Sequence, residues 1–383
     1  MFEGGRQNYH GSATAQRGVP YIVGMVQHIP WSRVTGFSAA LLALIATGIV
    51  LKNLSGILIP FVLAGFFSIL FKPFVQTLRS KGVPMVVCLL LVMLISGTAL
   101  WVVYVIVAAG IEAFQQRSLY YSQQLQSVIT SVNEAIAPML RRARIKTITW
   151  GDIVSAERVT SFATSQLTAM FTVLSDGFMV LLYLVFMLLG HEAFPAKVRA
   201  AFPDERGTMV LALFRTLNTK VRKYLIVKTG FNLLNGFITW IILEVFGVDF
   251  APLIGLLAFV FHYIPNFGSI ISTLIPSLLF LLQTRDIAQV TLLTAILTVA
   301  HNVIGNTIEP KVMGDRLDLS PVVVLFSLIF WGWMWGIVGM VLSIPIMAVT
   351  KALLGSVDST RPLAILMGAG EPPAVDLQEP AAS

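Results

Sequence analysis

Two apolar blocks in the last third of the chain decide the fold. The first, APLIGLLAFVFHYIPNFGSIISTLIPSLLFLLQ, spans residues 251–283, and the second, PVVVLFSLIFWGWMWGIVGMVLSIPIMAVTKALL, spans residues 321–354. Each block has a proline near its start, another 24 residues later, and a glycine-containing break between the two. The matching positions are Pro252 and Pro276, with Pro265 to Gly268 between them, and Pro321 and Pro345, with Gly332 to Gly339 between them.

The length of these blocks makes the breaks important. A straight helix over the first block would be about 48 Å long, whereas the apolar core of a bilayer is about 30 Å thick. Residues that break a helix at membrane depth free backbone polar groups, which must then face protein or water. We therefore predict that each block is a helix–break–helix hairpin beside a polar pocket, a pattern typical of transporters. The alternative is a kink at Pro or Gly in an ordinary membrane span.

Composition assigns the whole chain to the membrane. Of its 383 residues 56% are hydrophobic and 12% are charged, and the mean hydropathy is +0.82. Soluble domains have about 25% charged residues, so we predict an all-α polytopic membrane protein. It should contain six to eight transmembrane helices, with two broken or re-entrant helical hairpins in its C-terminal half. The net charge of +7 is spread over the connections. This distribution indicates membrane orientation rather than binding to nucleic acid.

The cysteine count and the start of the chain exclude further classes. Cys88 is the single cysteine, so we expect neither an intrachain disulfide nor a cysteine metal site. The first apolar run begins only after about 35 mainly polar residues, so we expect no cleavable signal peptide.

Changes of composition along the chain predict six segments. They are a disordered cytoplasmic arm (1–34), three transmembrane helices (35–110), an amphipathic helical region outside the membrane (111–168), a fourth span with a basic cytoplasmic connection (169–229), a broken-helix transport core (230–355) and a disordered tail (356–383).

Two topologies place both termini in the cytoplasm. Eight full spans leave 17 Lys and Arg residues inside and 9 outside, and six spans with two re-entrant hairpins leave 18 inside and 8 outside. Charge therefore does not choose between them. The second topology makes two span-plus-hairpin units of opposite orientation, 230–283 and 287–353, which would form an inverted repeat. We favour the second topology for this reason.

Polar residues gather near the two hairpins, where placing them in hydrocarbon would be costly. Asparagine offers donors and acceptors without charge, which suits a neutral polyol or a dehydrated cation. Histidine changes charge near neutral pH, so His262 is a candidate for coupling transport to protons. Each residue alone is more typical of a helix–helix hydrogen bond. The candidates for the substrate or ion path are Asn232, Asn235, His262, Asn266, Ser269, His301, Asn302, Asn306 and Glu309.

The motifs of common enzymes are missing from the sequence. It contains no HExxH, no GxSxG and no GxxxxGK[ST], so zinc hydrolysis, serine hydrolysis and ATP use have no recognisable site. We expect no enzyme activity, no cofactor and no metal centre. Transport should be secondary, driven by a gradient.

Three blocks carry a resemblance to a known family. The segments FHYIPNFGSIISTLIPSLL (261–279), IGNTIEPKVMGDRLDLSPVVVLFSLIFWG (304–332) and GIVGMVLSIPIMAVTKALL (336–354) resemble the most recognisable parts of the autoinducer-2 exporter-like family, or PerM-like permeases. The resemblance covers about residues 35–355. The run WGWMWG (331–336) departs from the family's more usual small-residue turn. The positions that match the family's motif are Pro265, Gly268, Pro276, Glu309, Pro310, Gly314, Pro321, Gly336, Gly339 and Pro345.

The resemblance implies a multi-pass transporter of the bacterial inner membrane. Among these matched positions we assign all the prolines, with Gly268, Gly336 and Gly339, to helix breaks. Export of the furanone signal autoinducer-2 is proposed for some members and sodium/proton antiport for others. We expect a lipid bilayer, a small polar solute or cation, and further copies of the same chain as partners.

Three functions remain open from the sequence. The first is an exporter of a small polar signal or metabolite. The second is a cation/proton antiporter, which would favour the titratable His262 and Glu309 over the asparagines. The third is an oligomeric channel or membrane scaffold without coupled transport.

Overall fold

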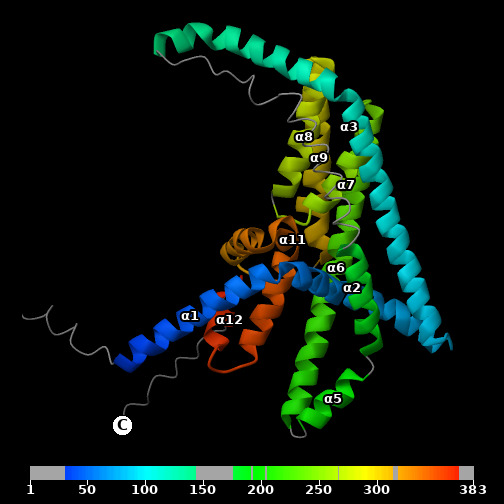
Figure 1. Cartoon of the computed structure of the whole chain (residues 1–383), viewed down its shortest axis with the longest axis vertical. Helices are drawn as coiled ribbons and strands as arrows, with labels where there is room; N and C mark the ends of the chain where they lie inside the picture. The colour runs from blue at the N-terminus through cyan, green and yellow to red at the C-terminus, as the bar shows by residue number, and fades with distance from the viewer. Residues whose placement is uncertain are drawn as a thin grey trace, which may run out of the picture. The chain divides into compact units, whose positions relative to one another are not determined.

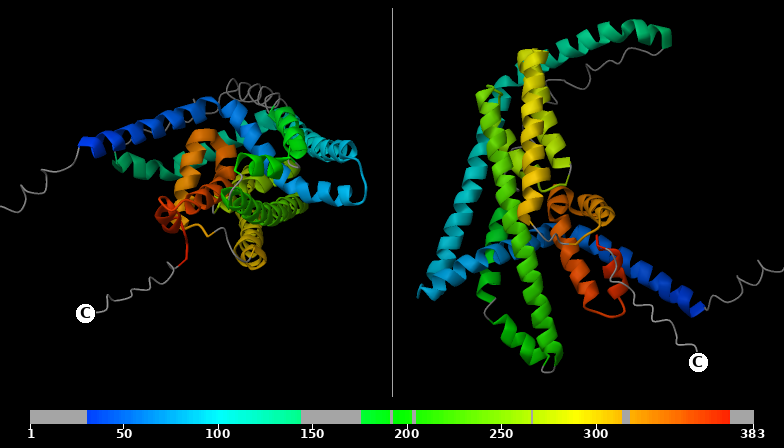
Figure 2. Two further views of the ribbon diagram at one scale, coloured as in Figure 1. Left: turned by 90° about the horizontal axis from the view of Figure 1, so that it is seen from below. Right: turned by 180° about the vertical axis from the view of Figure 1, so that it is seen from behind.

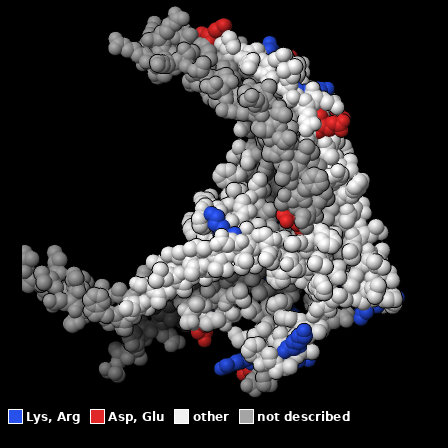
Figure 3. Space-filling model, in the orientation of Figure 1, with Lys and Arg blue, Asp and Glu red and all other residues white. Residues whose placement is uncertain are grey.

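The computed structural model describes residues 31–143, 176–190, 193–202, 205–265, 267–313 and 318–370. Regular structure in these residues is helical throughout (Figure 1). Six helices are long and apolar enough to cross a membrane. The count rises to seven if the helix Asp176–Gly190 and α5, bent by 64° relative to each other, form one span. The prediction of an all-α polytopic membrane protein is therefore confirmed. Figure 3 shows a face with few charged side chains and a mostly uncharged surface.

The helices follow one another with short connections. Backbone contacts divide the chain into two units at Asn53–Leu54, so that α1 is a unit apart from the helices that follow it. The elements are α1 (Trp31–Asn53), α2 (Ser55–Ser80), α3 (Met85–Ala143), the helix Asp176–Gly190, α5 (Phe194–Ala201), α6 (Glu205–Val245), α7 (Ala251–Phe261), α8 (Phe267–Thr284), α9 (Ile287–Asn302), the π-helix η3 (Val303–Ile308), α10 (Glu309–Met313), α11 (Pro321–Gly355) and α12 (Arg361–Leu366).

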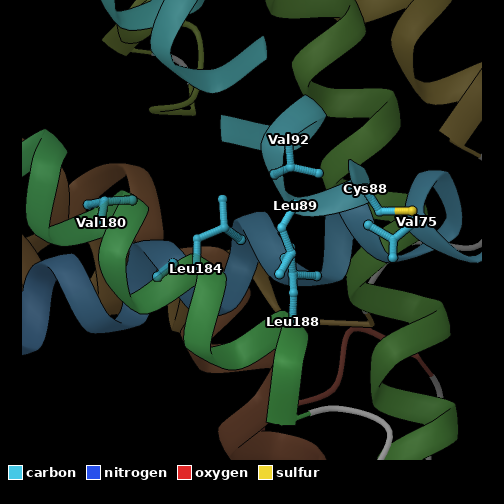
Figure 4. Close-up of a cluster of buried hydrophobic side chains, with 8 residues drawn as sticks. Val75, Cys88, Leu89, Val92, Val180, Leu184 and Leu188 are labelled. Carbon is cyan, nitrogen blue, oxygen red and sulfur yellow. The ribbon is translucent and has the colours of Figure 1, made fainter. Parts of the chain in front are cut away.

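Two apolar clusters hold the second unit together. The first joins α2, the start of α3 and the helix Asp176–Gly190, and it includes the lone cysteine, Cys88 (Figure 4). The second joins α6, α7, α8 and α9 around Phe280, which is 1% exposed. Both clusters lie among helices whose other faces carry exposed large apolar residues. This is the pattern expected where the outer surface meets lipid rather than water.

The first hairpin consists of α7, α8 and the break between them. The two ends of the hairpin meet: the Gln283 side chain donates to the carbonyl of Gly247 at 2.7 Å and accepts from the amide of Asp249 at 3.2 Å. A chain that enters at 247–249 and leaves at Gln283 therefore returns to the end from which it started. Both structural views show α7 and α8 side by side (Figures 1 and 2).

The second hairpin lies within α11. The helix bends at Trp335 (φ −127°, ψ 16°) and Gly336 (φ 63°, ψ −144°). The second conformation belongs to a region that is essentially restricted to glycine. The two halves then pack closely, and the hydroxyl of Ser327 donates to the carbonyl of Ser343 at 3.0 Å. The WGWMWG run thus makes a reversal although it lacks the usual small residues, because one glycine supplies the turn.

Helix α9 continues beyond its predicted end. It passes without interruption into η3 and α10, so that Ile287–Met313 is one helical span of 27 residues. The sequence predicted a polar loop after Gly305. Pro310 explains the difference, because proline has no N–H to donate to the fourth preceding carbonyl. The helix relaxes into a π-turn just before it, and the amide of Glu309 donates to the carbonyl of Ile304, five residues back.

Three prolines that the sequence assigned to breaks lie inside continuous helices. Pro276 is within α8, Pro345 is within α11, and Pro310 is in the first turn of α10. Each lacks one helical hydrogen bond, but packing against neighbouring helices retains the helix, as is common in membrane proteins. Pro321 occupies the first turn of α11, where the missing N–H costs nothing. The reversals occur only at 262–266 and at Trp335–Gly336.

Candidate functional site

A cavity of about 620 Å³ lies beside the break of the first hairpin. Its walls are α6, the α7–α8 break, the α9–η3–α10 span and the first half of α11, with Leu328 and Ile344 as apolar lining. Ligand pockets commonly range from about 300 to 1,000 Å³. The polar residues that line it are Tyr224, Lys228, His262, Ser269, His301, Asn302, Asn306 and Glu309.

The structure brings most of the predicted site residues together at this cavity. His262, Ser269, His301, Asn302, Asn306 and Glu309 all line it, as do Pro265, Pro310 and Pro321. Asn232 and Asn235 do not line it, because they are fully buried within the helix packing of α6. Gly268, Pro276, Gly336, Gly339 and Pro345 are likewise absent from its walls. Asn266 and Gly314 lie outside the described residues.

Hydrogen bonding fixes His301 in one neutral form. Thr239 donates its only hydroxyl hydrogen to the carbonyl of Asn235 at 2.7 Å, so His301 Nε2, 2.9 Å from Thr239 Oγ1, must donate to that oxygen. His301 Nδ1 then accepts from the hydroxyl of Thr273 at 3.0 Å. Both ring nitrogens are satisfied. The network also connects α6, α8 and α9 at the level of the break.

His262 has one nitrogen in use and one without a partner. Its Nδ1 donates to the carbonyl of Ala258 at 2.7 Å. Its Nε2 is buried and finds no hydrogen-bond partner among the described residues. The ring lies at an angle of 64° to that of His301, with 4.7 Å between the centroids. The free nitrogen and the cavity make His262 the more available of the two histidines for a solute, a water or a proton.

Tyr224 and Lys228 are site residues that the sequence analysis missed. The hydroxyl of Tyr224 is buried and has no partner in the described part of the chain. Lys228 Nζ lies 2.8 Å from Glu309 Oε1, and the two side chains are only 12% and 13% exposed. The sequence analysis counted Lys228 with the basic connection. The available signal was helical spacing, because Tyr224, Lys228 and Asn232 follow one another at intervals of four and share a helix face.

The contacts of α6 with the α9–α10 span show that the two run antiparallel. Lys228, early in α6, pairs with Glu309, late in that span, and Thr239, later in α6, pairs with the earlier His301. Within the span, the amide of Asn306 donates to the side-chain oxygen of Asn302 at 2.7 Å. The opposite directions of α6 and α9, each followed by a hairpin, agree with the predicted pair of span-plus-hairpin units.

Comparison with known sequences places this geometry in a family. The profile described as the AI-2E family transporter matches residues 39–358. The chain belongs to the AI-2E transporter family. Two relatives come from Escherichia coli strain K12. YhhT, provisionally named a transport protein, is 32% identical over 325 residues, covering 82% of this chain and 89% of the relative. The AI-2 transport protein TqsA is 31% identical over 313 residues, covering 81% and 89%.

A third relative extends the comparison to another organism. A provisionally named transport protein of Haemophilus influenzae is 30% identical over 321 residues, covering 83% of this chain and 91% of the relative. The predicted family is thus confirmed, and the chain is a multi-pass membrane protein of a bacterial transporter family.

The site of this AI-2E family chain offers hydrogen bonds rather than metal ligation. No group of three or more His, Cys, Asp or Glu side chains within the described ranges is arranged to hold a metal ion. The one carboxylate on the cavity wall, Glu309, is paired with Lys228. A solute in the cavity would meet the hydroxyl of Tyr224, the free nitrogen of His262, and the amides of Asn302 and Asn306.

Proposed function

We propose that this chain is a gradient-driven transporter that exports a small, neutral, polar solute through the 620 Å³ cavity. The observation that carries the proposal is a cavity beside a helix break, lined by buried polar groups that lack protein partners. A buried hydroxyl or ring nitrogen without a partner costs about 1–3 kcal/mol. A solute or water that satisfies Tyr224 and His262 recovers that cost.

The charges at the cavity favour a neutral solute. Lys228 and Glu309 neutralise each other at 2.8 Å, so the described walls present hydrogen-bond donors and acceptors with little net charge. A dehydrated cation needs several oxygen ligands, including uncompensated carboxylates or carbonyls. A furanone or polyol needs alternating donors and acceptors in a partly apolar pocket. TqsA is named an AI-2 transport protein, and a solute of that class suits this lining.

The two hairpins suggest how access to the cavity changes. Pro265 at the first break and Pro321 at the start of α11 both touch the cavity. Movement of either hairpin against the antiparallel pair of α6 and α9 would open one side of the cavity and close the other. We place the protein in the inner membrane as a homo-oligomer, with both termini in the cytoplasm.

Transport into proteoliposomes tests the proposal. The panel compares a furanone, a neutral polyol, sodium and no solute, with the wild type, Tyr224→Phe and Tyr183→Phe. Tyr183 packs edge-on against Phe61 outside the cavity, so its variant is a matched loss of a hydroxyl. We expect furanone or polyol flux in the wild type and in Tyr183→Phe. Loss of one hydrogen bond in Tyr224→Phe should raise the solute KM about tenfold. Equal KM values in both variants would contradict the assignment of the cavity.

Cation/proton antiport is the second candidate function, and the free Nε2 of His262 favours it. His262→Gln keeps hydrogen bonding but cannot titrate. If protons are coupled through this residue, the variant should flatten the pH dependence of transport between about pH 5 and 8. In inverted vesicles, added sodium should then dissipate a proton gradient only with the wild type. A variant that retains the wild-type pH profile would assign His262 to packing or solute contact.

A further inference from the structure

A second cavity lies at the opposite end of α11 from the transport cavity. It has a volume of about 360 Å³ and is formed by the N-terminal half of α6, the last turns of α11, and α12. No described residue lines both cavities. The transport site therefore does not account for it.

Basic side chains from three helices converge on the second cavity. Lys220 comes from α6, Lys351 from α11 and Arg361 from α12. The one carboxylate among its described lining residues is that of Asp318. The cavity therefore has an excess of two positive charges. Three helices that are far apart in sequence each contribute one cation, although like charges repel.

The single carboxylate is already committed to the protein. Lys351 donates to Asp318 Oδ2 at 2.6 Å and also to the Asp318 carbonyl. Asp318 Oδ1 accepts from the amide of Ala369 at 3.0 Å. The hydrogen bond from Lys351, with that from Ala369, lowers the pKa of the Asp318 carboxyl. Asp318 thus fastens the segment after α12 to α11, while Lys220 and Arg361 have no ion-pair partner in the described ranges.

The surface next to these cations is apolar. Leu217, Ala348 and Ala364 line the cavity between the charges. On the outside of α12, Leu366 is 76% exposed and Leu363 is 53% exposed. Lys351 lies one turn before the end of α11, where the apolar run of that span stops. Cations at the end of a membrane span, beside exposed apolar side chains, match the boundary between lipid headgroups and acyl chains.

We propose that the second cavity binds the phosphate of an anionic phospholipid headgroup. Lys220 and Arg361 contact the phosphate, and the ion pair of Lys351 with Asp318 positions α12 beside them. The exposed leucines of α12 contact the acyl chains. A bound lipid would connect α6 to the end of the second hairpin, because its phosphate contacts both α6 and α12. This inference does not depend on which solute the protein transports.

Lipid binding to the purified full chain in detergent tests the proposal. Native mass spectrometry compares phosphatidylglycerol, phosphatidylcholine, glycerol phosphate and inorganic phosphate at equal concentration. The cavity variant is Lys220→Gln with Arg361→Gln. The control is Lys223→Gln with Arg206→Gln, which removes the same charge from exposed positions of α6 outside the cavity. We expect the cavity variant to weaken phosphatidylglycerol binding about 30-fold, from about tenfold for each basic contact. The control should bind like the wild type.

Other outcomes overturn the proposal. Equal weakening in the control would reduce it to the general attraction of a basic surface. Binding of inorganic or glycerol phosphate as tight as that of phosphatidylglycerol would assign the cavity to a free phosphate. If the double glutamine variant does not fold, the swap Lys220→Arg with Arg361→Lys keeps the charges and should keep lipid preference. Loss of that preference in a folded swap variant would show that charge at these positions does not select the lipid.

Discussion

Replacement of Gly268 by alanine tests the tight reversal of the first hairpin. Gly268 is the second residue of α8, where a Cβ would lie 2.2 Å from the carbonyl oxygen of Phe261 and 2.6 Å from its carbonyl carbon. The Cα of His262 would be 2.8 Å away. All three are backbone atoms, so no rotamer change relieves the contacts. Carbon contacts are optimal at about 3.5–4.0 Å, and the two chain segments must therefore separate by about 1 Å.

The magnitude of the effect follows from this displacement. Overpacking a well-packed site typically costs about 1–3 kcal/mol. A clash with backbone should reach the upper end, about 3 kcal/mol. At about 2 °C for each kcal/mol, appropriate for a larger chain, the melting temperature in detergent should fall by about 6 °C. Because His262 adjoins the displaced backbone, solute flux should fall as well.

Thermal unfolding of the purified protein, with Gly230→Ala as control, measures the effect. A Cβ on Gly230, within α6, would meet no atom within 4 Å, and alanine there should stabilise the helix by about 0.5–1 kcal/mol. The Gly268 variant should melt well below the wild type and the Gly230 variant slightly above it. A Gly268 variant that melts with the wild type and transports normally would refute the tight reversal.

Three further perturbations test other parts of the structure. Lys228→Met leaves Glu309 buried without its partner and should destabilise the protein by about 3–5 kcal/mol; adding Glu309→Gln should recover most of this loss in thermal unfolding, and additive losses would contradict the pairing. The folded-state pKa of Asp318 is lowered, so its contribution is present at neutral pH and is lost as the pH falls through that value. The melting temperatures of the wild type and Asp318→Asn should therefore differ at pH 6 and converge below about pH 4; a difference that persists at low pH would have another cause. Single cysteines at Val248 and Gln283, in a cysteine-free background, should react with an impermeant reagent from the same side of the membrane, because the hairpin ends meet; labelling from opposite sides would require two full spans.

The sequence predicted where the reversals lie but not which polar residues share a cavity. Length against bilayer thickness, together with Pro265, Gly268 and the glycines around Gly336, indicated two broken helices, because helix length and backbone freedom are local properties. The internal prolines were over-interpreted. Whether a proline interrupts a membrane helix depends on packing from other helices, and at Pro310 the chain formed a π-turn instead.

Tertiary packing decided the composition of the site. Asn232 and Lys228 lie one turn apart on α6, yet only Lys228 lines the cavity, because the direction each side chain faces is set by the helices packed around α6. The pairing of Lys228 with Glu309, 81 residues later, turned two apparent charges into a neutral wall. Composition and periodicity therefore determined a membrane transporter with broken helices. Contacts between distant segments determined the electrostatics of its cavity, since charge neutralisation at 2.8 Å depends on a distance that no local pattern encodes.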